Sequence, residues 1–183
     1  MRKIDYIIVI VLLLFVFVPA GIGRVILETN EILYITYSQE LIDEAIIFYD
    51  YEASEIPCEE IIVQDIAELY DKVPIYKYKD IGQKFARVPI IGINNIYLKP
   101  TINIRYLPFV LAHELEHTNF VMNEFTANYN AITKLLESDK LYLQAIAKRN
   151  ALYALRGGYS RKNRNYDCTE LLVEYYLKET AND

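Results

Sequence analysis

Apolar residues recur at three- and four-residue spacings along most of the chain, which is typical of amphipathic helices with one buried face. In the first such stretch they include Leu41, Ile42, Ala45 and Ile46, and the preceding Ser38 can cap a helix. The same pattern predicts helices over residues 39–51, 57–73, 108–117, 124–137, 140–155 and 167–178. Most of the chain is therefore expected to be helical.

Residues 75–104 follow a different pattern. Glycine, proline and asparagine separate short β-prone runs there, of which the clearest are Pro89–Ile93 and Ile96–Lys99. The region is expected to form a small sheet or hairpin. The run Pro89–Leu98 is either an edge strand on which an extended peptide can pair or a purely structural hairpin. The predicted fold class is α+β, mostly helical with a small β-sheet.

An uncharged, mostly apolar segment precedes these elements. It spans the 18 residues Tyr6–Gly23 and follows Arg2 and Lys3. As a helix it would cover about 27 Å, close to the roughly 30 Å of a bilayer core. We expect residues 1–24 to form one N-terminal transmembrane helix, with a cleaved signal peptide as the alternative. The basic N-terminus predicts that residues 25–183 lie outside the cytoplasm as a single-pass membrane protein, or are secreted after cleavage.

Composition narrows the class of protein further. About 160 of the 183 residues follow the apolar segment, which fits one domain. The net charge of −6 argues against nucleic acid as a partner, because phosphate binding needs clustered Lys and Arg on a basic surface. Cys58 and Cys168 are the only cysteines, so a Cys-rich zinc site is excluded. They form either one disulfide, if the domain lies outside the cell, or two thiols.

Charge is distributed unevenly along the chain. Val25–Asp71 holds 13 acidic residues and no Lys or Arg, whereas Lys140–Tyr166 holds 7 basic residues and no acidic one. We expect these stretches to face each other across the fold or to cover solvated helix faces. A functional basic patch is the alternative.

Both histidines of the chain lie in one motif, H-E-x-x-H over residues 113–117, in a helix that Pro108 can begin. Residues four apart share a helix face, so His113 and His117 can point imidazole nitrogens at one ion. Zinc suits this pair, since it binds neutral imidazole and keeps a position for water in catalytic sites. Glu114 would lie beside the ion, where its carboxylate can accept a proton from water. Glu116, in the variable part of the motif, is expected to be exposed.

Catalytic zinc sites usually have a third protein ligand. The chain has no third histidine, so acidic residues and cysteines remain. A break after the motif, followed by a second helix, would lay Glu124 against the histidine helix, with Asn128 one turn further on the same face. Glu124 is the expected third ligand, and Asn128 could steady a ligand through a hydrogen bond.

A group that polarises the substrate carbonyl is expected opposite Glu114. The candidates are Tyr142, Arg149 and Tyr153, because they lie on the helix that is expected to return past the cleft. The residues themselves do not distinguish among the three.

The stretch from Pro89 to Leu155 resembles a family of uncharacterised membrane-bound proteins that are predicted to be zinc metallopeptidases. In that family an apolar-flanked H-E-x-x-H motif is followed by E-x-E-A-N. The matching parts here are Leu107–His117 and the register E-x-x-A-N-x-x-A that begins at Glu124. The chain differs at Phe120, where the family usually has a small residue, and at Thr126, which replaces its second acidic residue. A similar glutamate-bearing second helix occurs in gluzincins, including the ImmA/IrrE-type peptidases.

The resemblance implies a zincin-like fold with a thermolysin-like active-site core. His113, His117 and Glu124 would then bind Zn²⁺, and Glu114 would be the catalytic base. The expected function is zinc-dependent hydrolysis of peptide bonds in a peptide or protein substrate by a membrane-tethered, gluzincin-like metallopeptidase. The alternative is a non-catalytic, membrane-anchored binding module whose zinc is structural.

Overall fold

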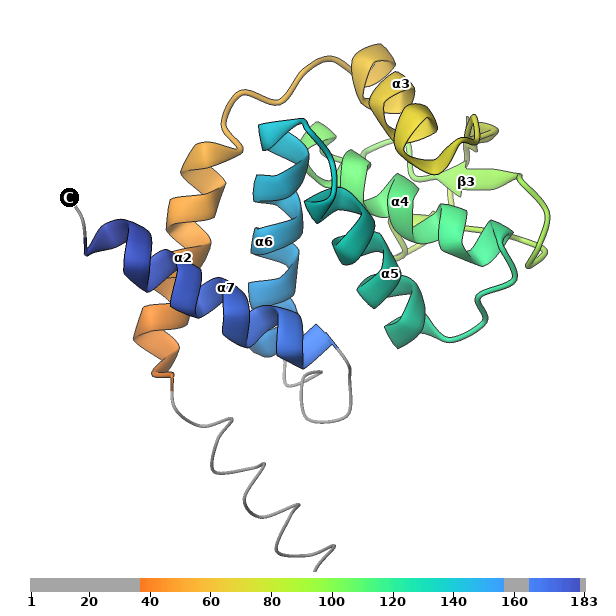
Figure 1. Cartoon of the computed structure of the whole chain (residues 1–183). Helices are drawn as coiled ribbons and strands as arrows, with labels where there is room; N and C mark the ends of the chain where they lie inside the picture. The colour runs from red at the N-terminus through yellow and green to blue at the C-terminus, as the bar shows by residue number, and fades with distance from the viewer. Residues whose placement is uncertain (1–36, 157–164, 182–183) are drawn as a thin grey trace, which may run out of the picture. The chain divides into compact units, whose positions relative to one another are not determined.

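The chain is mostly helical with a small three-stranded sheet, as the computed structural model shows for residues 37–156 and 165–181 (Figure 1). The side chains of residues 165–170 are not described. The helices are α2 (Gln39–Glu52), α3 (Glu59–Tyr70), α4 (Leu107–Thr118), α5 (Glu124–Leu136), α6 (Leu141–Arg156) and α7 (Asn165–Thr180). A short 3-10 helix, η1 (Ile104–Tyr106), runs directly into α4, and the strands are β1 (Tyr76–Tyr78), β2 (Ala86–Arg87) and β3 (Ile96–Leu98). These elements agree with the expected α+β class.

The helices begin and end close to their predicted bounds. Local backbone conformation explains where a helix ends. α3 ends at Tyr70 because Asp71 takes a left-handed conformation, with φ 49°, and its N–H donates back to the carbonyls of Ala67 and Glu68. α7 begins at Asn165, two residues before the expected cap Asp167. The breaks between the other helices lie where the sequence places them.

The predicted membrane segment, residues 1–24, lies outside the described residues, as do Gly157 and Gly158. None of the helices in the described ranges combines the length and apolar character needed to cross a membrane. Cys58 is exposed before α3, whereas the side chain of Cys168 is not among the described ones. The choice between a disulfide and two thiols therefore stays open.

The sheet differs from the prediction in one strand. Its order is β1-β3-β2, with β1 parallel and β2 antiparallel to β3. The predicted strand Ile96–Lys99 is confirmed as β3, but Pro89–Ile93 is a turn and the second strand lies upstream, at Ala86–Arg87. Pro89 has no N–H to donate to a sheet, and Gly92 has φ 84°, which is incompatible with strand backbone.

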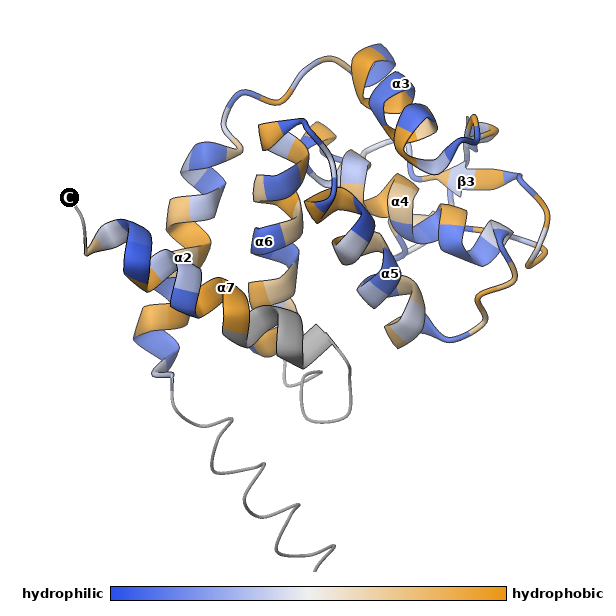
Figure 2. Ribbon diagram, viewed as in Figure 1, coloured by the Kyte–Doolittle hydropathy of each residue, from blue (hydrophilic) through white to orange (hydrophobic). Residues whose placement is uncertain are grey.

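The core lies where the apolar faces of the helices meet. α6 packs against α2, α5 and α7, and α4 packs against α3, α5, α6 and β2 (Figure 1). Hydrophobic and hydrophilic residues alternate along each helix, as one buried face requires (Figure 2). The fully buried side chains include Ile62, Leu98, Leu111, Leu115, Leu135 and Ile146. α4 is covered on several sides, since nine of its twelve residues are buried.

A buried ion pair ties α6 to α2. Nη1 of Arg149 donates to Oδ1 of Asp50 at 2.8 Å, and Nη2 donates to the Arg105 carbonyl at 3.2 Å. The Arg149 side chain is only 4% exposed and its guanidinium lies 5.4 Å from the Tyr106 ring centroid. The guanidinium therefore joins two helices to the segment that leads into α4.

Asp50→Ala is expected to lower the free energy of unfolding by about 1.5–3 kcal/mol, because the buried guanidinium keeps its charge and loses its partner. The control is Asp43→Ala, which breaks a 3.4 Å pair with Arg156 in which both side chains are at least 40% exposed. That loss should stay below about 1 kcal/mol. Urea denaturation measures both variants, and equal losses would contradict a structural role for the Asp50 pair.

Candidate metal centre

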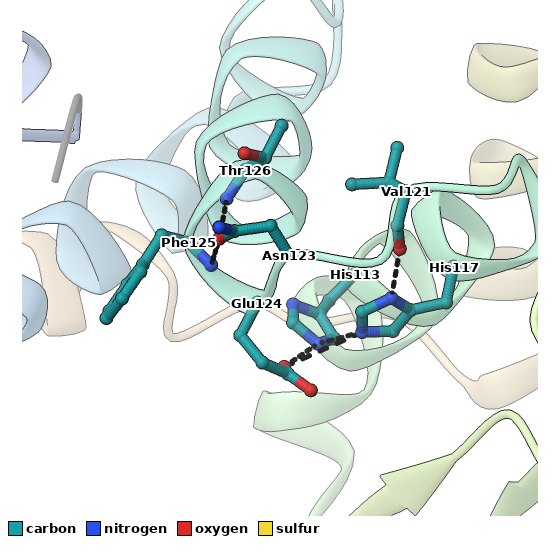
Figure 3. Close-up of polar contacts among 7 residues, drawn as sticks. All are labelled: His113, His117, Val121, Asn123, Glu124, Phe125 and Thr126. Carbon is teal, nitrogen blue, oxygen red and sulfur yellow. Dashed lines mark hydrogen bonds and ion pairs between the residues drawn. The ribbon is translucent and has the colours of Figure 1, made fainter.

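α4 carries both histidines on the face that it turns toward the start of α5 (Figure 3). The Nε2 atoms of His113 and His117 lie 3.1 Å apart. The side chains are 14% and 7% exposed, respectively. Phe109 flanks the first ring, at 6.2 Å between centroids. The expected arrangement of two imidazoles pointing at one place is confirmed.

A tight turn after α4 fixes the orientation of His117. Asn119 caps the helix, and Phe120 follows in a left-handed conformation with φ 65°. The N–H groups of Phe120 and Val121 donate to the carbonyls of His117 and Glu116, at 3.3 and 3.2 Å, which is the Schellman arrangement. The Val121 carbonyl then lies 2.6 Å from Nδ1 of His117 (Figure 3). Because a carbonyl only accepts hydrogen bonds, Nδ1 carries a proton, and in the neutral imidazole of His117 the Nε2 atom is then a free lone pair.

Glu124 is the first residue of α5, and a helix cap sets its position. The side-chain oxygen of Asn123 accepts hydrogen bonds from the N–H groups of Phe125 and Thr126, at 2.8 and 3.2 Å. Oε2 of Glu124 lies 3.1 Å and 3.5 Å from the Nε2 atoms of the first and second histidine (Figure 3). The three predicted ligand residues are thus brought together, with their ligand atoms within 4.8 Å of one another.

When both imidazoles are neutral, the two Nε2 atoms and Oε2 of Glu124 have too few protons to satisfy one another. Nε2 of His117 is then a lone pair, and a carboxylate oxygen of Glu124 only accepts. A proton on Nε2 of His113 could satisfy one of these two acceptors, whereas a cation at the shared point satisfies all three. Two imidazoles and one carboxylate are a donor set that suits a first-row divalent ion such as zinc.

Glu114 lies deep beside this group. Burial raises the pKa of its carboxyl to about 7, while the charge of His117 and a hydrogen bond from the Val88 backbone act in the opposite direction. Burial also lowers the pKa of His113, and the neighbouring His117 acts in the same sense. The imidazole of His113 is thereby kept in the neutral form that binds metals. The Glu114 carboxyl is suited to exchanging a proton near neutral pH.

An open cleft of about 820 Å³ contains the whole group. Its walls come from residues 84–88 around β2, from α4 and from the first turn of α5. Asn128 lies on the α5 wall, on the same face as Glu124, as predicted. Glu124 is the most accessible of the three ligands, with 70% of its side chain exposed. The site is therefore closed on the side of the histidines and open to solvent on the side of Glu124.

The three predicted carbonyl-polarising residues do not line this cleft. The Tyr142 hydroxyl donates to Asp65 at 2.7 Å, and Arg149 pairs with Asp50. Tyr153 is 41% exposed and lies away from the cleft lining. α6 packs mainly against α2, α5 and α7, and none of the three residues lines the cleft, so the structure does not bring them to the site. Among the described residues, side-chain donors on the cleft wall are Lys84, Arg87 and Asn128.

Glu116, which the variable part of the motif predicts to be exposed, is buried at 7% exposure. The prediction was wrong because α5 and Tyr70 cover this side of α4. Nδ2 of Asn130 donates to Oε2 of Glu116 at 2.9 Å, and the pKa of Tyr70 is raised by burial and then by the Glu116 charge. This bond ties α4 to α5 behind the ligands.

A lysine contacts the C-terminal end of α4. Nζ of Lys72 donates to Oγ1 and the carbonyl of Thr118, at 2.7 and 3.3 Å, and to Oδ1 of Asn119 at 2.8 Å. A cation is stabilising there because the carbonyl end of a helix carries partial negative charge. Neither Lys72 nor the Val121 carbonyl was predicted, since each acts through a turn whose geometry the motif does not specify.

Comparisons of the chain with protein-family models, curated proteins and solved structures found no match. The expected likeness to membrane-bound metallopeptidases therefore stays a prediction. The interpretation of the cleft depends on the positions and chemistry of its own side chains.

Glu116→Ala is expected to lower the free energy of unfolding by about 1–3 kcal/mol, because the partly buried Asn130 amide loses its acceptor. Glu116→Gln should lose less, since its amide oxygen can still accept that bond. The control is Glu137→Ala, an exposed residue on the same side of α5, with an effect below about 0.5 kcal/mol. Chemical denaturation that finds the two alanine variants equally stable would refute the proposed link.

Proposed function

We propose that the protein is a zinc-dependent peptidase of the zincin type, in which His113, His117 and Glu124 hold the metal and Glu114 transfers protons. The observation that carries this proposal is the convergence of three acceptor atoms beside a buried carboxyl group. A membrane tether formed by residues 1–24, with the peptidase domain outside the cytoplasm, is part of the same proposal.

Zinc is favoured by the kind and number of its ligands. Two nitrogens and one oxygen from protein leave room for water or substrate, which distinguishes catalytic from closed structural zinc sites. The exposed position of Glu124 at the cleft opening is consistent with such an open site. When bound, zinc would supply Lewis-acid chemistry, lowering the pKa of a water molecule and polarising a carbonyl group.

Glu114 would handle the protons of the reaction. Its carboxylate accepts a proton from the attacking water and later delivers it to the nitrogen of the departing amine, so that one group performs both transfers. A carboxyl with a pKa near 7 is suited to both steps at neutral pH. The protein walls behind it limit the access of bulk water to this proton.

The free edge of β2 gives a peptide substrate a place to bind. Within the part of the chain that the structure describes, β2 has a neighbouring strand, β3, on one side only. The Lys99 N–H donates to the Phe85 carbonyl at 2.8 Å, so the backbone groups of Phe85 point toward β3. In an antiparallel pair, successive residues point their backbone groups alternately toward the partner strand and away from it. The backbone groups of Ala86 and Val88 therefore point to the free edge. The Val88 N–H hydrogen-bonds Glu114, so this edge runs beside the proton-transfer group. An extended peptide paired with Ala86 would lie next to the metal ligands.

Glu114→Gln is expected to keep one zinc per chain and to lower kcat about 10²–10⁴-fold, because the amide cannot accept the proton of water. His117→Ala should lose both zinc and turnover. Elemental analysis and hydrolysis of a mixed peptide pool at neutral pH measure these effects, with Glu137→Gln as the control for loss of a carboxylate. An active Glu114→Gln protein would refute the role of Glu114. Zinc that is bound without hydrolysis of any peptide would favour the binding-module alternative.

Removal of metal with a chelator is expected to abolish hydrolysis, and added zinc should restore it. Zinc at 100 times its Kd should also raise the free energy of unfolding by about 2.7 kcal/mol, because it binds only the folded chain. The double variant His113→Ala/Glu124→Ala should show no such increase. Full activity after chelation would contradict metal dependence, and an equal stabilisation of the double variant would locate the zinc elsewhere.

A further inference from the structure

One wall of the cleft is basic, although the chain as a whole is acidic. The segment Lys72–Arg105, which contains the whole sheet, holds seven Lys and Arg but only one acidic residue, Asp80, while the net charge of the chain is −6. Lys84 and Arg87 of this segment are exposed and line the cleft. No ion pair joins either of them to an acidic residue that the structure describes. Their charges are therefore available to a ligand.

The basic character continues from the cleft across one face of the sheet. The strand register places Lys77, Tyr97 and Arg87 side by side in one row. Directly paired residues project to the same face of a sheet. The ammonium groups of Lys77 and Lys79 lie 4.9 and 4.7 Å from the Tyr97 ring centroid. We call Lys77, Lys79, Lys84 and Arg87 the basic strip.

We propose that the cleft selects extended peptide segments with acidic side chains flanking the scissile bond, and that Lys84 and Arg87 recognise those carboxylates. This inference rests on the proposed peptidase function. The formal charges of Lys84, Arg87, Glu114 and Glu124 cancel, so a bound divalent ion would leave the cleft with a net positive charge. Because a cleft concentrates the field of its charged walls, acidic segments are favoured there and basic ones are repelled.

One further observation supports this choice of ligand. The free edge of β2 borders the cleft, so a paired peptide would run past both cations. A nucleic acid fits less well, because the chain as a whole has 25 acidic residues against 19 basic ones and therefore carries a net charge that repels phosphates.

The test uses the zinc-loaded full chain and three peptides that share one cleavable core and differ only in flanking Glu, Gln or Lys residues. kcat/KM should be about 3- to 10-fold higher for the Glu peptide than for its Gln counterpart, since exposed ion pairs are individually weak. The Lys peptide should be the poorest substrate. The preference should reside mainly in KM and shrink as ionic strength rises.

The double variant Lys84→Glu/Arg87→Glu should reverse this order, so that the Lys peptide becomes the best substrate. Its control is Lys99→Glu/Lys140→Glu, which changes the net charge equally at positions that do not line the cleft. The control should keep the original order. An equal fall of kcat for all three peptides in the cleft variant would overturn the proposal, because it would assign the two cations to catalysis and not to selection.

A binding experiment tests the recognition of acidic peptides independently of the peptidase function. Fluorescence anisotropy with the zinc-loaded Glu114→Gln chain reports affinity for the same peptides without turnover. Tighter binding of the Glu peptide with no cleavage by the unmodified chain supports acidic recognition and refutes the peptidase. Cleavage without a charge preference overturns acidic recognition and leaves the peptidase intact. Failure to bind any peptide, or tighter binding of a single-stranded oligonucleotide, overturns the proposal.

Discussion

The turn between α4 and α5 determines where every candidate ligand lies. It ends α4 at Thr118, one residue after His117, and directs the Val121 carbonyl at Nδ1 of that histidine. Within a few residues it leads to the cap that starts α5 at Glu124. The backbone of Phe120 is left-handed, which costs a residue other than glycine roughly 1–2 kcal/mol. The hydrogen bonds of the turn and the Lys72 contacts at the helix end offset this cost.

The resulting site is packed on the side of α4 and accessible on the side of Glu124. α4 is enclosed by α3, α5, α6 and β2, so Glu114 and the two imidazoles are held in packed surroundings. Burial there raises the pKa of the carboxyl and lowers that of His113. Glu124 lies at the opening, and β2 presents an unpaired edge beside it. In the proposed mechanism, proton transfer would take place on the enclosed side, and the substrate would enter from the open side.

The amino-acid pattern predicts most of the helices and the ligand set, because both depend on regular spacing. His113 and His117 share a face whenever residues 113–117 are helical, and a break followed by a second helix returns Glu124 to them. The pattern fails where packing from distant segments decides the outcome. Glu116 is buried because Tyr70 and Asn130 cover it, and β2 is too short, at two residues, to show strand alternation. The partners of Tyr142 and Arg149 lie 77 and 99 residues away, which no local spacing indicates.

The central claim is that one ion is bound by two imidazoles and the Glu124 carboxylate. X-ray absorption at the zinc edge of the metal-loaded protein tests it most directly, because it reports the atoms around the ion without requiring a substrate. We expect two nitrogen neighbours at about 2.0–2.1 Å and oxygen neighbours at about 2.0–2.2 Å, with the imidazole signal lost in the His117→Ala variant. Sulfur neighbours at about 2.3 Å, or an unchanged spectrum in that variant, would contradict the account.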